Sequence, residues 1–185
     1  SSHMARIEAL TVENASPEGA QILRAIQEKI GMIPNLYATM AHSPAALSAA
    51  LAFGDAMGTS VLSAQVKEQL ALAIAGANSC DYCASAHTAI GKMTGVDADE
   101  LSKNVSGNAS DPKVQALLTF ATTVVNTRGD VADSDIEKAR SAGVTDAELV
   151  EVVASVAINT YTNYFNHIAQ TKIDFPVVET SCSAC

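Results

Sequence analysis

Signals for the start of a helix recur along this chain, and they constrain its fold more than any other feature. At Ser16-Pro17, Ser43-Pro44 and Asp111-Pro112, a capping side chain is followed by proline. A Ser or Asp oxygen can accept hydrogen bonds from the first amides of a helix, and proline suits the first helical position because it has no amide hydrogen. Glycines such as Gly31 and Gly129 follow as stop signals. The segments between these signals are therefore expected to be helices.

The apolar residues within these segments indicate the same class. They repeat at three- and four-residue spacing, as Val66, Leu70 and Ile74 do, and no strand pattern carries turn chemistry of its own. Hydrophobic residues make up 48% of the chain and aromatic ones only 4%, which suits closely packed helices. We predict an all-α bundle of roughly eight helices. They are expected to begin at or just after Ser16, Ser43, Ser63, Cys80, Asp97, Asp111, Asp133 and Thr145.

Length and charge bound the organisation of the chain and its partners. With 185 residues, we expect a single domain over residues 4–176, after an expression-tag remnant at 1–3 and before a flexible tail at 177–185. A formal net charge of −9 argues against binding to nucleic acid or to anionic lipid, both of which need a basic surface. The apolar runs are too short to span a bilayer, and no secretory signal precedes them. We therefore expect a cytoplasmic protein.

Two segments of the chain resemble each other weakly, as an internal duplication would. Glu68 to His87 and Glu148 to His167 have the same length, and several apolar positions agree between them. The second segment has Thr160 and Asn163 where the first has its cysteines. If the segments are copies, only the first can carry out thiol chemistry.

The densest group of reactive side chains lies near the middle of the chain. Cys80 and Cys83 are three positions apart, His87 follows Cys83 by four positions, and Glu68 precedes Cys80 by twelve. On the first turn of a helix, backbone amides stabilise a thiolate, and two sulfurs one turn apart can close a disulfide. His87 falls on the same helix face as Cys83 and can exchange a proton with it near neutral pH.

Glu68 lies on the preceding predicted helix. If that helix folds back antiparallel, the carboxylate comes toward His87, where it would fix the imidazole tautomer and raise its basicity. This group of side chains predicts thiol redox chemistry. Two alternatives stay open: Cys80 and Cys83 could form half of a zinc site whose other half is Cys182 and Cys185, or they could be buried cysteines without chemistry.

The spacing of these residues resembles a known family. Glu, eleven residues, Cys-x-x-Cys, three residues and His is the pattern of the alkylhydroperoxidase AhpD-like family, within the carboxymuconolactone decarboxylase superfamily, and Glu68, Cys80, Cys83 and His87 match it. The segment from Leu70 to Ser79 is also similar to the family's helix before the thiols. Further segments, at residues 31–35, 163–169 and 174–176, resemble the peroxidase-related subgroup.

The resemblance implies an activity and a role for each residue. It implies an all-helical protein that assembles as trimers or hexamers and reduces small hydroperoxides with electrons from an external dithiol, with no cofactor or metal. Cys83 would then attack the peroxide, Cys80 would resolve the product to a disulfide, and Glu68 and His87 would form a proton relay. The best-known member has a histidine directly before the second cysteine; here Tyr82 stands there, and it either offers a hydroxyl to the relay or fills space.

The C-terminal tail carries a second Cys-x-x-Cys, formed by Cys182 and Cys185. We interpret it as a tethered shuttle that exchanges with the Cys80–Cys83 disulfide, including that of a neighbouring subunit; the alternative is an incidental exposed tail. Two rival functions also stay open. One is the superfamily's other chemistry, decarboxylation of a lactone acid without thiols, and the other is a non-enzymatic redox sensor or helical scaffold.

Overall fold

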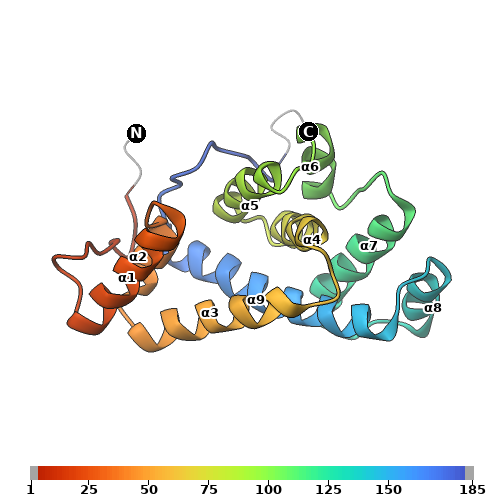
Figure 1. Ribbon diagram of the computed structural model, residues 1–185. Coiled ribbons are helices and arrows are strands. Elements are labelled where there is room, and N and C mark those ends of the chain that lie inside the picture. The colour runs from red at the N-terminus through yellow and green to blue at the C-terminus, as the bar shows by residue number, and fades with distance from the viewer. Residues whose placement is uncertain (1–3, 182–185) are drawn as a thin grey trace. The chain divides into compact units, whose positions relative to one another are not determined.

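The computed structural model describes residues 4–181, and within that range the protein contains nine α-helices and no strand (Figure 1). The all-α prediction is confirmed. The helices are α1 (Pro17–Ile30), α2 (Asn35–Met40), α3 (Pro44–Ala56), α4 (Ala64–Ala77), α5 (Asp81–Met93), α6 (Ala98–Val105), α7 (Pro112–Thr127), α8 (Asp133–Ser141) and α9 (Asp146–Ala169), with a 3-10 helix η1 (Met57–Thr59) after α3.

Local capping explains where most of these helices begin. Ser16, Ser43 and Ser63 each accept a hydrogen bond from the amide three residues on, at 3.1, 3.2 and 3.1 Å. Asp111 Oδ2 accepts two amides of the first turn of α7, at 3.1 and 3.0 Å. Gly31 ends α1 with a left-handed backbone, at φ 87°. The predicted starts of α1, α3, α4 and α7 are therefore confirmed. They could be predicted because each cap lies next to the helix that it begins.

The sequence carries no local start signal for α2, and this helix is an addition to the predicted set. Its N-cap residue is Pro34, which provides no side-chain hydrogen bond. The Asn35 amide instead donates to Asp174 Oδ2 at 2.7 Å, 139 residues away in the sequence, and Asn35 Nδ2 donates to the carbonyl of Lys172 at 3.0 Å. The cap of α2 is therefore supplied by a distant segment that no local pattern reveals.

By their internal contacts, the described residues fall into two compact units. Unit 1 comprises the chain up to Thr59 together with Phe165–Asp174, and unit 2 comprises Ser60–Tyr164 together with the chain from Phe175 onward. In unit 1, helices α1 to α3 bury Leu23, Met40 and Leu47. The single domain expected over residues 4–176 stays a prediction.

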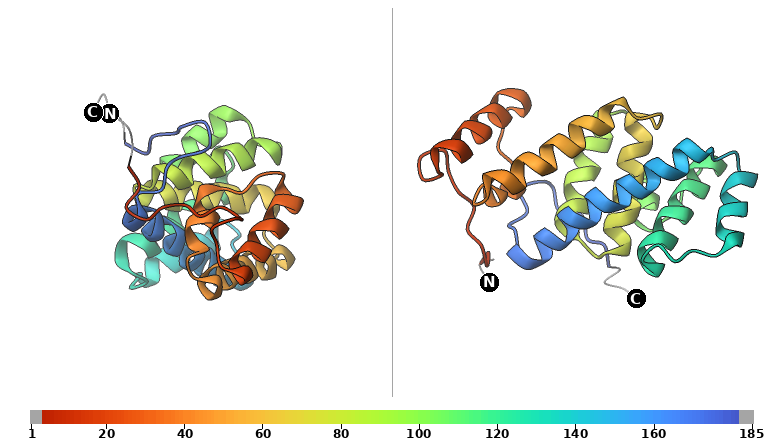
Figure 2. Two further views of the ribbon diagram at one scale, coloured as in Figure 1. Left: turned by 90° about the vertical axis from the view of Figure 1, so that its left-hand side faces the viewer. Right: turned by 90° about the horizontal axis from the view of Figure 1, so that it is seen from below.

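The core of unit 2 is built around α4, whose residues 69–75 are all buried. Helices α5, α6 and α7 pack against α4, and α8 packs against α7 (Figure 2). A helix that is buried all round must be apolar all round, which is why this segment reads Leu-Ala-Leu-Ala-Ile-Ala. A buried hydrophobic cluster joins α4 and α7 to α8 and the first turns of α9, through Leu70, Ile74, Leu117, Leu118, Phe120, Ala139 and Val152 among others.

Two glycines allow α6 to approach its neighbours closely. A Cβ atom added to Gly76 of α4 would clash with the backbone carbonyl of Val105, and one added to Gly91 of α5 would lie 2.6 Å from Leu101 Cδ2. Real Cβ atoms essentially never come so near. The absence of side chains at Gly76 and Gly91 therefore sets the distance of α6 from the α4–α5 pair.

The weak likeness of the two segments noted in the sequence does not extend to their structure. Residues 68–87 are divided between α4 and α5 by a turn, whereas residues 148–167 lie in the single helix α9. Glu148 forms an ion pair with Lys113 at 3.0 Å and accepts the amide of Thr145, which places it at the start of α9 as a helix-start residue.

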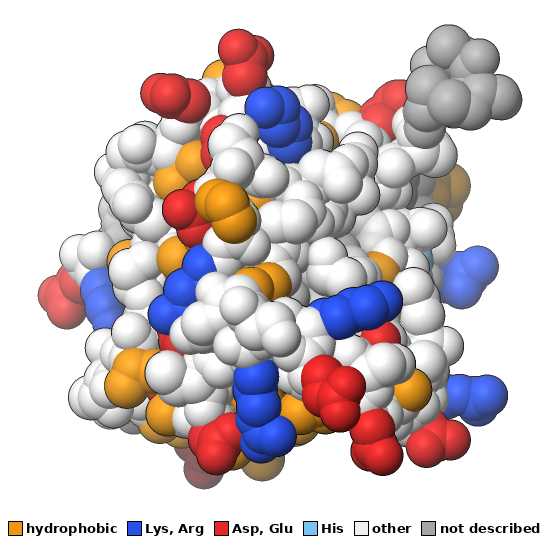
Figure 3. All heavy atoms as spheres, turned by 90° about the vertical axis from the view of Figure 1, so that its right-hand side faces the viewer, with side chains coloured by type: hydrophobic (Ala, Val, Ile, Leu, Met, Phe, Trp, Pro, Cys, Tyr) orange, Lys and Arg blue, Asp and Glu red, His pale blue; other side chains and the backbone are white. Residues whose placement is uncertain are grey.

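The surface carries charges of both signs. On the face drawn in Figure 3, acidic and basic side chains are interspersed, and Lys and Arg do not form a stripe. Among residues 4–181, none of the helices combines the length and the apolarity that crossing a membrane requires.

Candidate active site

The turn between α4 and α5 positions the two thiols. After Asn78, Ser79 adopts a left-handed backbone, at φ 55°. The Ser79 amide donates to the carbonyl of Gly76 at 3.2 Å, and the Cys80 amide donates to that of Ala75 at 2.9 Å. These are the two hydrogen bonds of a Schellman helix end. Cys80 thus closes the turn after α4 and caps α5, so only residues 78–80 separate the two helices.

Asn78 ties this turn to α9. Its Nδ2 donates to Asn163 Oδ1 at 3.0 Å and lies 3.3 Å from Thr160 Oγ1. Asn163 is completely buried. Since a buried amide hydrogen bond is costly to break, α9 fixes the turn that carries Cys80. Sequence reasoning did not assign Asn78 a role, because its partners lie more than eighty residues away.

Both central cysteines are buried thiols at the start of α5. Cys80 and Cys83 are each 2% exposed. Cys80 is the N-cap residue, and its Sγ accepts the backbone amide of Cys83 at 3.4 Å. A sulfur that accepts an amide at a helix N-terminus is stabilised as a thiolate. The predicted placement of one thiol at the helix end and the other one turn in is therefore found.

Glu68 and His87 meet across the two antiparallel helices. Glu68 Oε2 lies 2.6 Å from His87 Nδ1, with side-chain exposures of 18% and 24%. Burial opposes a charged imidazole, but the Glu68 carboxylate and its hydrogen bond, with a smaller effect of Cys83, outweigh it and raise the pKa of His87 above its ordinary value. The approach of Glu68 to His87 expected from an antiparallel pair is therefore present.

The protonated form of His87 changes what the site can do. A raised pKa keeps more of the imidazole charged, with Nδ1 bound to Glu68. The charge of Cys83 contributes to this shift, so the two groups interact. By the same attraction the imidazolium favours the thiolate of Cys83. Each sulfur thus has its own stabilising group: an amide for Cys80, and His87 for Cys83.

Tyr82, between the thiols, is packed against the C-terminal segment. It is 4% exposed, and its ring meets that of Phe175 edge to face, with centroids 6.0 Å apart and planes at 89°. Asp81 and Ser85, which sequence reasoning left without a role, bind the same segment at Thr180 and Val178. Only their spacing of four residues, which places both on one helix face, could have signalled a shared partner.

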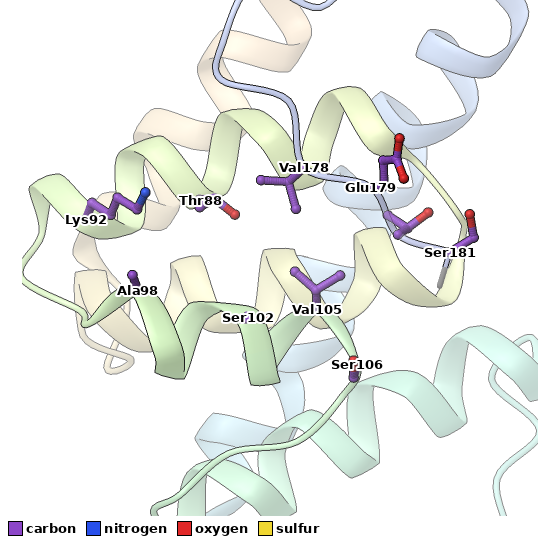
Figure 4. A pocket seen from close by; sticks show the side chains of 10 residues that line it. Thr88, Lys92, Ala98, Ser102, Val105, Ser106, Val178, Glu179 and Ser181 are labelled. Carbon is purple, nitrogen blue, oxygen red and sulfur yellow. The ribbon is translucent and has the colours of Figure 1, made fainter. Parts of the chain in front are cut away.

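A pocket of about 360 Å³ adjoins α5, between this helix, α6 and the C-terminal segment (Figure 4). On α5 it is lined by Lys92 and by Thr88, whose buried Oγ1 has no hydrogen-bond partner among residues 4–181. At 100° per residue, Thr88 and Lys92 share a helix face with Asp81 and Ser85. That face is turned roughly 200° from Cys83 and His87. The pocket therefore lies away from the face on which Cys83 and His87 meet Glu68.

Cys182 and Cys185, the predicted shuttle thiols, lie outside the described residues. The alternative of a zinc site formed by all four cysteines needs these two residues, so it also lies outside the described part of the chain. Among residues 4–181, no cluster of three or more His, Cys, Asp or Glu side chains could hold a metal ion.

Comparisons with known proteins connect this site to a family. Residues 44–110 match the model of the carboxymuconolactone decarboxylase family. An uncharacterized peroxidase-related protein from Ralstonia eutropha JMP134, described as an alkylhydroperoxidase AhpD core, has a TM-score of 0.84 at 24% identity, and the match covers 94% of both chains. A second such protein, from Silicibacter sp. TM1040, has a TM-score of 0.78 at 24% identity and covers 90% of this chain and 92% of its own.

The same fold also occurs in a protein with another stated activity. The debrominase Bmp8 has a TM-score of 0.76 at 20% identity over 94% of both chains. One of its variants has been solved with 2,3,4-tribromopyrrole. No curated protein matches the chain. These likenesses establish the fold.

Proposed function

We propose that this chain is an AhpD-like member of the carboxymuconolactone decarboxylase superfamily, and that it is a thiol-dependent peroxidase that reduces small hydroperoxides at Cys83 and Cys80. The observation that supports this most is the hydrogen bond of 2.6 Å between Glu68 and His87, next to a Cys-x-x-Cys helix start. A half-buried carboxylate, an imidazole and two thiols can together move electrons and a proton. The 2% exposure of both sulfurs favours small substrates.

The cycle begins at Cys83. Its thiolate attacks one oxygen of the hydroperoxide, the O–O bond breaks, and Cys83 becomes a sulfenic acid. The departing alkoxide takes a proton from His87, which the Glu68 carboxylate keeps charged. One alcohol, or water in the case of hydrogen peroxide, leaves the site.

Cys80 completes the oxidation. Its sulfur attacks the sulfenic sulfur of Cys83, water leaves, and the two sulfurs are joined as a disulfide. An external dithiol then attacks this disulfide, and two exchange steps return both thiols to the reduced form while the donor becomes a disulfide. The need for such a donor suits the reducing cytoplasm in which we expect the protein.

Steady-state consumption of a small alkyl hydroperoxide with dithiothreitol as donor tests this cycle. We expect turnover in the wild type, its loss in Cys83→Ser, and a fall of about 10²-fold or more in Glu68→Gln, which keeps the hydrogen bond but removes the charge. Decarboxylation of a lactone acid that survives Cys83→Ser would instead support the superfamily's other chemistry. Reduction of 2,3,4-tribromopyrrole without peroxide turnover would favour a debrominase. No turnover of any of these would leave a sensor or a scaffold.

We also propose that the protein forms a homo-oligomer through α9. This helix exposes apolar side chains at spacings of three, four and seven or eight residues, with exposures between 41% and 70%: Val150, Val153, Tyr161, Tyr164 and Ile168. Such a stripe is typical of a helix that packs against another helix. A second copy of the same stripe would cover it, in line with the trimers or hexamers that the resemblance implies.

A further inference from the structure

The last described residues of the chain are attached to the first turns of α5. The Thr180 amide and hydroxyl both donate to Asp81 Oδ1, at 2.9 and 2.7 Å. The Val178 amide donates to Ser85 Oγ at 2.8 Å, while Ser85 in turn donates to the carbonyl of Asp81 at 2.7 Å. Three hydrogen bonds thus join this segment to the start of α5, and a fourth within α5 connects their two acceptor residues.

The segment lies on α5 in an extended form with two distinct sides. Val178 and Thr180 are half-buried, whereas Val177 and Glu179 are exposed, which is the alternation of a strand. Val178 and Glu179 both line the pocket, and Figure 4 shows the Val178 side chain directed toward Val105 of α6. The segment is therefore held in place by packing as well as by hydrogen bonds.

The direction of the segment points to the thiols. Asp81 and Ser85 are about 6 Å apart along the helix axis, close to the roughly 6.6 Å that two extended residues span. Thr180 pairs with Asp81 and Val178 with Ser85, so the chain runs antiparallel to α5, toward its N-terminus. The residue at that terminus is Cys80, the neighbour of Asp81.

Chain length sets the reach of the next cysteine. Cys182 lies two residues beyond Thr180, so its Cα is within about 7 Å of the Thr180 Cα whatever its conformation. A disulfide needs a Cα–Cα separation of about 4.4–6.8 Å. While Thr180 stays bound to Asp81, chain length therefore keeps Cys182 near the N-terminus of α5, where Cys80 lies. Cys83 is the farther target, because its helix face is turned roughly 200° from that of Asp81.

We propose that Cys182 and Cys185 act in the same chain as the direct reductant of the Cys80–Cys83 disulfide, guided to Cys80 by the binding of Val178 and Thr180 to α5. The inference rests on the proposed peroxidase function. It names the reductant that first meets the oxidised site, and it assigns Asp81 and Ser85 as positioning residues for that step.

The exchange conserves electrons and protons. The Cys182 thiolate attacks the Cys80 sulfur, the Cys80–Cys83 bond breaks, and Cys83 leaves as a thiolate. The Cys185 thiolate then attacks the Cys182 sulfur and releases Cys80. Two electrons and two protons have passed from the terminal pair to the active-site pair. The Cys182–Cys185 disulfide that forms is the substrate of the external dithiol.

This arrangement would give a reductant access to the buried thiols of the active site. Cys80 and Cys83 are 2% exposed, so a dithiol protein cannot approach them closely without rearrangement. A segment already bound next to Cys80 needs only a local opening, and its effective concentration is in the millimolar range typical of short tethers. A large donor then has to reach only the terminal pair.

Trapping the mixed disulfide tests the proposal. The wild type and the double variant Cys83→Ser, Cys185→Ser, in which neither neighbouring thiol can break the mixed disulfide, are oxidised with diamide, alkylated and mapped by mass spectrometry of non-reduced peptides. We expect the double variant to accumulate a Cys80–Cys182 disulfide within one chain, and the added change Thr180→Pro, which removes both donors to Asp81, to lower its yield about tenfold. The exposed neighbour Glu179→Ala is the matched control and should keep the yield. A Cys182 bond to another chain, or equal yields in Thr180→Pro and Glu179→Ala, would overturn the proposal.

Turnover provides the second readout. With a dithiol protein of the thioredoxin class as donor, the double change Cys182→Ser, Cys185→Ser should lower steady-state hydroperoxide consumption about tenfold, and it should leave the first, single turnover unchanged. An unchanged steady state would refute the relay. Diamide forms the disulfide whether or not the protein reduces peroxides, so a failure of the peroxidase function and a failure of the relay give different results.

Discussion

Replacing Gly76 by Ala should destabilise the protein, although the same change in an exposed helix would stabilise it. Alanine is favoured over glycine inside a helix by about 0.8–1.0 kcal/mol. The new methyl group, however, would meet the backbone carbonyl of Val105, which cannot rotate away as a flexible side chain could. Overpacking of this kind costs typically 1–3 kcal/mol, and a backbone contact belongs at the upper end. The net loss should be about 2 kcal/mol.

Gly54 of α3 offers a matched control. It is exposed, and an added Cβ would have no atom within 4 Å. Gly54→Ala should therefore gain about 0.5–1 kcal/mol. Urea unfolding followed by circular dichroism, at one protein concentration and with equal m-values, measures both changes. If Gly76→Ala were as stable as Gly54→Ala, α6 could not approach α4 as closely as the structure has it.

Three further predictions concern the site and the assembly. Because the pKa of His87 is raised in the folded protein, protonated His87 stabilises the fold fully below the ordinary pKa of 6.5, and this stabilisation is lost as pH rises through the folded pKa. Glu68→Gln removes the carboxylate that raises this pKa, so its free energy of unfolding should fall less above pH 6.5 than that of the wild type. After peroxide treatment, Cys80→Ser should retain a sulfenic acid that dimedone labels, and Cys83→Ser should not. Tyr161→Lys should lower the oligomer mass measured by sedimentation velocity. If each active site lies within one subunit, the activity per folded chain should stay unchanged.

The parts of the fold that follow from short-range interactions could be predicted from the sequence. Ser16, Ser43 and Ser63 cap their own helices three residues on, so their neighbours carry the whole signal. The meeting of Glu68 and His87 follows from one further condition, an antiparallel helix pair. That condition is met because a short turn at residues 78–80, whose last residue Cys80 caps α5, separates α4 from α5.

The rest depends on partners far away in the sequence. The first turn of α2 is capped by Asp174, 139 residues on, and Asp81 binds Thr180 across 99 residues. A carboxylate or a hydroxyl can accept from any amide that the fold brings near, so nothing in the local sequence identifies which one it will be. The extended segment at 177–181 was expected to be a flexible tail for this reason, since it has neither helical period nor turn chemistry.

The start of α5 combines two tasks by placing them on different faces of one helix. Cys83 and His87 are four residues apart and share the face where His87 meets Glu68. Asp81 and Ser85 are also four residues apart, on a face turned roughly 200° away, and they bind the C-terminal segment. Cys80 is the N-cap residue of α5, so it belongs to neither face and lies at the N-terminal end of the helix, where both faces begin. In the proposed cycle, peroxide would react with Cys83 on one side of the helix while the reductant approached Cys80 from the other, so the two half-reactions would not compete for one route to the thiols.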